Sequence, residues 1–297
     1  MVDRMIGAGW ASVHGPSDPR TALLWALDRG FHGLMVAPAP RVMDWEGLRV
    51  GVEKLPFKFG GVRVSSIADG ESPAEGGLAS ANRGDRLASC AAVGQSVELA
   101  RRLGAHRVVL DPGIVQVPGE VRHSDLGDRN ADWSEDKARG LYARRGAQLN
   151  RAMDGLCRVL FELCKSFPDM TFCLSLSRNV LSLGEPGALS SIFEDLPRCR
   201  LGYWHDTVAA ACREVFLGED PGHALEVSSK YLQGMTLGDY GDGECYLPPG
   251  SGGVDYSLLS NYRHRTAKDF PVAVELDPGV DPGEIPGVHA ILNKFGL

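Results

Sequence analysis

The chain lacks several features that would place it in a class at once. Its seven cysteines form no Cys-x-x-Cys pair, which disfavours a disulfide framework and favours a reducing, cytoplasmic setting. No run of roughly 18 apolar residues occurs, and no basic segment leads into an apolar one at the start, so we expect neither a membrane span nor secretion. The acids are dispersed and the net charge is −7, which argues against a nucleic-acid partner.

A Gly-x-Gly-x-x-Gly motif is also missing after the first predicted strand, which disfavours an open dinucleotide-binding sheet. What the chain has instead is a regular alternation of short apolar runs and longer helical patterns. This alternation predicts an α/β protein with a parallel sheet, closed as a single (β/α)8 TIM barrel over residues 1–297. The expected strands are Met5–Ala11, Gly33–Ala37, Gly61–Ile67, Arg107–Asp111, Met170–Ser177, Arg200–Trp204, Tyr231–Leu237 and Pro271–Leu276.

The helical segments carry recognisable periodicity and start signals. Apolar residues fall three and four apart along Ala147–Phe167, which predicts a helix with one apolar face. Ser17-Asp-Pro-Arg20 is typical of a helix N-cap followed by proline in the first turn. We interpret Arg144-Arg145 as a solvated helix face.

Acidic residues stand at the ends of several expected strands. In a TIM barrel these ends form one rim, where active sites lie. Carboxylates that converge there can bind a divalent cation or act as general acid and base. Asp206 has a second reading, since it also stands where it would cap the following helix. The candidates on this rim are Asp111, Asp206 with its neighbour His205, Asp239 and Glu275.

Other residues have both a functional and an ordinary interpretation. Trp10 and His14 follow the first strand and are candidate substrate contacts, although such aromatics more often belong to the core. Gly250-Ser-Gly-Gly253 offers backbone N–H groups to a phosphate, or is a turn. His123, with Asp125 and Asp128, is either a lid over the mouth or a solvated loop.

The order of several motifs is similar to that of the xylose-isomerase-like barrel superfamily, which includes sugar phosphate isomerases and epimerases. The similar segments span most of the chain between Ala81 and Glu275. They are Tyr203-Trp-His-Asp206 at the sixth strand, Thr236-Leu-Gly-Asp239 at the seventh, the glycine-rich Gly250-Ser-Gly-Gly-Val-Asp255, and Val274-Glu275 at the eighth.

The resemblance implies a divalent metal (Mn, Mg, Zn or Co) held by Glu, Asp, His and Glu from strands five to eight. Asp206 and Glu275 match this set and are the candidate catalytic residues and, together with Asp111, the candidate metal ligands. The remaining two ligand positions hold Ser177 and Thr236. Ser177, Asp239 and His205 are candidate substrate contacts.

Two functions remain open at this point. The first is isomerisation or epimerisation of a sugar or polyol, with a remodelled metal site. The second is a non-catalytic barrel that binds a sugar or metabolite and has lost the metal-dependent chemistry. Loss of the strand-five glutamate favours the second, and retention of Asp206 and Glu275 favours the first. In both cases we expect a small carbohydrate-like ligand and no nucleic-acid or membrane partner; a homo-oligomer is compatible with the sequence.

Overall fold

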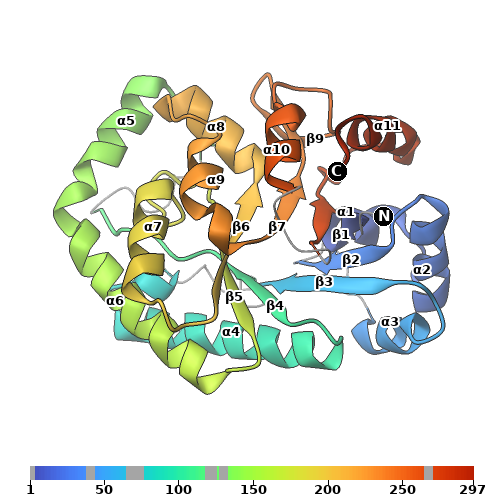
Figure 1. Ribbon diagram of the computed structural model, residues 1–297, viewed down its shortest axis with the longest axis horizontal. Coiled ribbons are helices and arrows are strands. Elements are labelled where there is room, and N and C mark those ends of the chain that lie inside the picture. Colours follow the sequence, from blue (N-terminus) through green and yellow to red (C-terminus); the bar gives the residue numbers. More distant parts are fainter. Residues whose placement is uncertain (1–3, 38–43, 65–76, 118–125, 127–132, 264–269) are drawn as a thin grey trace.

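A computed structural model describes residues 4–37, 44–64, 77–117, 126, 133–263 and 270–297. Eight parallel strands close into a barrel in the order β1-β10-β7-β6-β5-β4-β3-β2, and helices surround them (Figure 1). This confirms the predicted TIM barrel. The barrel strands are β1 (Arg4–Gly7), β2 (Gly33–Val36), β3 (Lys58–Arg63), β4 (Arg107–Leu110), β5 (Thr171–Ser175), β6 (Leu201–Asp206), β7 (Leu232–Leu237) and β10 (Val272–Val274).

Helices follow the strands along the described chain, and one antiparallel hairpin interrupts the alternation after β7. The hairpin strands are β8 (Asp239–Gly241) and β9 (Glu244–Leu247). The α-helices are α1 (Ala8–His14), α2 (Pro19–Asp28), α3 (Trp45–Val52), α4 (Arg83–Arg102), α5 (Glu135–Arg144), α6 (Gly146–Ser166), α7 (Pro186–Asp195), α8 (Thr207–Leu217), α9 (His223–Ser228), α10 (Tyr256–Arg263) and α11 (Ile285–Phe295). No helix in these described ranges is long and apolar enough to cross a membrane.

The inside of the barrel is filled by one small cluster of apolar side chains. Successive strand residues point to opposite faces, so every second residue of each strand enters the interior. Trp204 is the largest member, and Gly234 on β7 gives it room, since a Cβ at Gly234 would overlap the indole ring. The cluster consists of Met5, Met35, Val109, Cys173, Trp204 and Ala273.

The helix signals are confirmed. Helix α6 spans Gly146–Ser166, close to the predicted bounds, and Asp18 caps α2 by accepting the Thr21 N–H, with Pro19 in the first turn. The first strand is a correction: it ends at Gly7, and α1 begins at Ala8, where we expected the strand to continue to Ala11. The sequence of Met5–Ala11 does not show this boundary, because apolar residues alone do not distinguish a short strand from a short buried helix.

Candidate functional site at the mouth of the barrel

Side chains alternate in direction along a strand, so the interior cluster shows which residues at the strand ends face the mouth. Residues two positions beyond an interior residue on the same strand again point inward, one layer closer to the C-terminal ends. Gly7, Asp111, Asp206 and Glu275 follow Met5, Val109, Trp204 and Ala273 in this way. Arg63 pairs with Val109, and Thr236 pairs with Asp206, so both share that face. These six residues belong to the layer at the mouth, to which the same rule adds Ala37 and Ser175.

Glu275 follows β10 and lies against the end of β1. Its carboxylate occupies the space that a side chain at Gly7 would need, because a Cβ built on Gly7 would overlap it. Burial raises the pKa of Glu275 to about 7; the positive charge of Arg63 opposes this shift, and the negative charge of Asp206 adds to it. A carboxyl group with this pKa can both accept and donate a proton near neutral pH.

Arg63, the last residue of β3, reaches across the mouth to residues of β6 and β7. Its Nη2 donates to Thr236 Oγ1 at 3.0 Å and lies 3.8 Å from Asp206 Oδ2. The side chain is 28% exposed, whereas that of Asp206 is 4% exposed. The guanidinium therefore places a positive charge close to the buried carboxylate of Asp206, on the side nearer to solvent.

Asp206 lies at the end of β6, and its two oxygens are both engaged. Oδ1 accepts the backbone N–H groups of Val208 and Ala209, both at 3.1 Å, which caps α8. Oδ2 accepts the hydroxyl of Tyr246, on β9, at 3.2 Å. The N-cap interpretation is thus confirmed, and the carboxylate is also part of the mouth.

The residues at this position do not fit a divalent cation. The Thr236 hydroxyl accepts from Trp204 Nε1 at 2.8 Å and from Arg63, so both of its lone pairs are used. Asp206 Oδ1 already accepts two backbone N–H groups, and Oδ2 accepts the Tyr246 hydroxyl and lies 3.8 Å from the Arg63 guanidinium, whose positive charge would repel a second cation. Within the described ranges, no three His, Cys, Asp or Glu side chains are grouped so that they could hold a metal ion.

A second polar group lies on the other side of the mouth, at β4 and β5. The Ser177 hydroxyl donates to Asp111 Oδ2 at 3.0 Å, and the Ser182 hydroxyl donates to Oδ1 at 3.3 Å. Three strands separate β4 from β10 in either direction around the barrel, so Asp111 and Glu275 stand on opposite sides. Asp111 is exposed. The structure therefore brings a carboxylate to Ser177, the residue that stands in the strand-five glutamate position of the resemblance.

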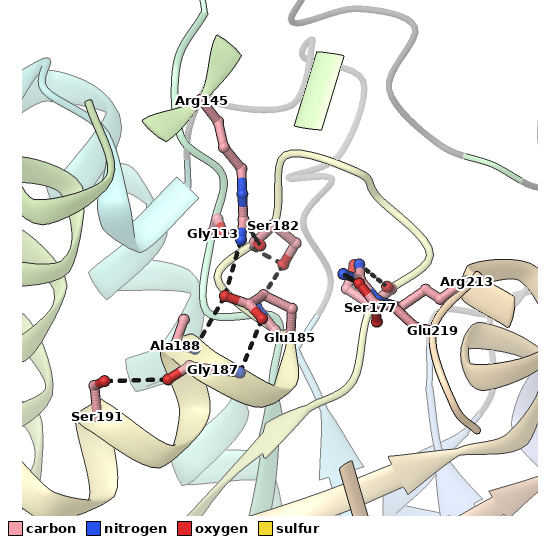
Figure 2. A network of polar contacts seen from close by, with 11 residues as sticks. Gly113, Arg145, Ser177, Ser182, Glu185, Gly187, Ala188, Ser191, Arg213 and Glu219 are labelled. Carbon is pink, nitrogen blue, oxygen red and sulfur yellow. Dashed lines mark hydrogen bonds and ion pairs between the residues drawn. The ribbon is translucent and has the colours of Figure 1, made fainter. Parts of the chain in front are cut away.

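A buried network supports the loop that carries Ser177 and Ser182 (Figure 2). Arg145 donates to the Ser182 carbonyl at 3.0 Å and to Glu185 at 2.9 Å, and both Arg145 and Glu185 are buried. Arg213 donates to the Ser177 carbonyl at 3.4 Å. The interpretation of Arg145 as a solvated residue is wrong, because this arginine turns inward to a carboxylate 40 positions away in the chain.

His205 does not join the residues of the mouth. It lies between Trp204 and Asp206 on β6 and therefore points outward, toward the helices. Its Nδ1 is 2.7 Å from the Tyr203 hydroxyl, it is 1% exposed, and burial lowers its pKa to about 3. It lines a pocket of about 320 Å³ with residues of α8, α10 and the loops beside them.

Three other candidates have structural partners. Asp239 is fully buried and accepts the backbone N–H groups of Gly250 and Val254, at 2.9 and 3.0 Å. It therefore holds both ends of the glycine-rich segment. Trp10 is fully buried in α1, and its Nε1 donates to the Val280 carbonyl at 2.8 Å. His14 Nε2 lies 2.8 Å from the Pro278 carbonyl. Their contact with a ligand stays a prediction.

Sequence reasoning missed two residues of the mouth and could not be tested on others. Arg63 ends β3 in the structure, whereas the expected strand Gly61–Ile67 places this residue near its start, so the sequence pattern does not mark Arg63 as a strand-end residue. Tyr246 lies in the β8–β9 hairpin with a φ of +58°, and no sequence signal places it beside Asp206. His123, Asp125 and Asp128 lie outside the described residues.

Comparisons with known proteins establish the fold. No family model matches the chain, and no curated protein matches it. Among solved structures, a D-tagatose 3-epimerase-like protein is 14% identical, with a TM-score of 0.69 over 99% of this chain and 97% of its own. The 3-keto-D-glucoside 4-epimerase YcjR from E. coli is 12% identical, with a TM-score of 0.67 over 99% and 100%. The probable 3-DHS dehydratase AsbF from Bacillus anthracis is 11% identical, with a TM-score of 0.62 over 100% and 99%.

The resemblance drawn from the strand-end motifs is thereby confirmed at the level of the fold. The neighbours include sugar epimerases and a dehydratase, so one barrel supports more than one reaction. The fold alone therefore does not determine the reaction, which depends on the residues at the mouth of the barrel.

Proposed function

We propose that the chain isomerises or epimerises a small carbohydrate or polyol that carries a carbonyl group, with Glu275 as a proton-transferring residue. The main support is the placement of Glu275: its carboxyl group lies over Gly7 at the mouth of the barrel, where the positive charge of Arg63 acts on it. Its pKa near 7 suits a group that takes a proton from carbon and later returns it.

The second side of the mouth determines which of the two reactions follows. Isomerisation needs one carboxylate, which moves a proton between neighbouring carbons on one face of a planar intermediate. Epimerisation inverts one carbon and needs a second group on the opposite face. Asp111, held by Ser177, stands opposite Glu275 and is that second group. The pair therefore favours epimerisation.

The substrate class follows from the surroundings of Glu275. Arg63 favours a substrate on which negative charge develops at oxygen during proton removal, as it does next to a carbonyl. The hydroxyl groups of Ser177 and Tyr246 and the Asp111 carboxylate offer hydrogen bonds to a polyol. The names of two structural neighbours, a D-tagatose 3-epimerase-like protein and a 3-keto-D-glucoside 4-epimerase, agree with this class.

Exchange of carbon-bound hydrogen tests the proposal. Keto- and aldo-sugars are incubated with the protein in D₂O, and deuterium at each carbon is followed by NMR. In wild type we expect exchange together with inversion. Glu275→Gln is expected to lower the rates of exchange and of inversion ~10²- to 10⁴-fold. Asp111→Asn leaves exchange by Glu275 but stops inversion. Asp18→Asn, which replaces one good helix cap by another far from the mouth, serves as the control.

The alternative of a binding protein without catalysis has one observation in its favour: protein donors already occupy the Thr236 hydroxyl and Oδ1 of Asp206. The same experiment separates it. A sugar that binds, as measured by calorimetry, but exchanges no hydrogen in wild type contradicts the proposed catalysis and supports this alternative.

A further inference from the structure

The position of Arg63 has a consequence beyond proton transfer by Glu275. Its guanidinium contacts Thr236 and approaches Asp206, the residues in the strand-seven and strand-six ligand positions of the resemblance. It also acts electrostatically on Glu275, in the strand-eight position. One side chain from β3 thus contacts Thr236, lies close to Asp206 and acts on Glu275 through its charge, the three positions around which a resident cation would sit.

The position of Arg63 is favoured electrostatically by the carboxylates of Asp206 and Glu275. Two carboxylates with little access to water repel each other, and a nearby positive charge reduces that cost. Arg63 supplies one full positive charge that is not lost in proteins, because a guanidinium is not deprotonated. Its planar group has five N–H donors, of which the bond to Thr236 uses one. The group can therefore hold its position and still bind an oxygen of a ligand.

We infer that the Arg63 guanidinium replaces the divalent metal in this barrel and binds the carbonyl or enediolate oxygens of the ligand. This inference rests on the proposed function for its ligand class. The saturated hydroxyl of Thr236 supports it independently, since that hydroxyl has no lone pair left for a metal. Arginine is well suited to the task, because its fork matches a planar pair of oxygens better than the point charge of lysine does.

Binding of glycolohydroxamate tests the inference, because this anion imitates a planar enediolate and also chelates metals. Its affinity is measured by calorimetry with EDTA and, separately, with Mn²⁺. For wild type we expect binding in EDTA and no increase in affinity with Mn²⁺. Arg63→Met is expected to weaken binding ~10- to 100-fold, as loss of a charged hydrogen bond does, and Arg63→Lys to weaken it less. Arg49→Met, which removes a partly exposed arginine of α3 that pairs with Glu46 and Glu53, is the matched control.

Three results overturn the inference: binding that needs Mn²⁺, no change in Arg63→Met, or no binding to wild type at millimolar probe. If Arg63→Met does not fold, as judged by circular dichroism, Arg63→Lys decides, since it keeps the charge and loses the fork. Failure of the proposed function gives a different pattern. In that case the probe binds through Arg63 without metal, but no sugar exchanges hydrogen.

Discussion

The two sides of the barrel mouth differ in how they hold a carboxylate. On the first side, the carboxyl group of Glu275 lies over Gly7. Burial raises its pKa to about 7, and the charges of Arg63 and Asp206 act on it in opposite directions. On the second side, Asp111 is exposed, and its donors among the described residues are the hydroxyl groups of Ser177 and Ser182 and the backbone N–H of Gly113. The first side tunes its acid by burial and charge, whereas the second fixes the position of its acid and leaves it in water.

The two sides of the mouth also differ in which part of the structure holds the carboxylate in place. Glu275 is placed by barrel strands, whose ladder hydrogen bonds fix it directly. Ser177 and Ser182, which hold Asp111, stand on a loop that depends on the buried pair Arg145–Glu185 (Figure 2). The comparison therefore predicts that the second side can be disturbed without the first, and the following variants test this independence.

The largest effect is expected for Arg145→Met. It leaves Glu185 buried without its cation, which should lower the free energy of unfolding by about 3–5 kcal/mol. Urea unfolding measures this. The double variant Arg145→Met/Glu185→Gln should lose less than the sum of the single variants, because the unpaired charge is removed. If Arg145→Met also changes the pH dependence assigned to Glu275 below, the two sides of the mouth are not independent.

How far the sequence predicts this molecule depends on the range of the contacts involved. The barrel is predictable because apolar runs and helix periods are local, and Asp206 and Glu275 are found because they end such runs. The opposite orientations of His205 and Asp206 were also within reach, since consecutive strand residues face opposite ways. The Arg145–Glu185 pair and the place of Tyr246 were not, because each depends on a partner about 40 positions away.

The next effect concerns pH and the first side. The pKa of Glu275 rises from 4.5 to about 7 on folding. Between these values the folded state keeps a proton that the unfolded state releases, so the free energy of unfolding falls as pH rises. Glu275→Gln carries no such penalty. Its stability relative to wild type should therefore increase from pH 4.5 to 7, by up to about 3 kcal/mol, and then stay constant.

Urea unfolding of both proteins between pH 4 and 8 measures this difference. A pH-independent difference between Glu275→Gln and wild type would contradict the account given for the first side.

The smallest effect is expected for Ser177→Ala, which removes one hydroxyl donor from Asp111 and should cost less than about 1 kcal/mol of stability. Its value lies in a different quantity, the ratio of inversion to hydrogen exchange in D₂O. If Ser177 positions Asp111, this ratio falls while exchange by Glu275 continues, and Ser177→Thr, which keeps the hydroxyl, restores it. A loss of inversion and exchange in equal proportion would instead mean that both sides of the mouth depend on one shared arrangement.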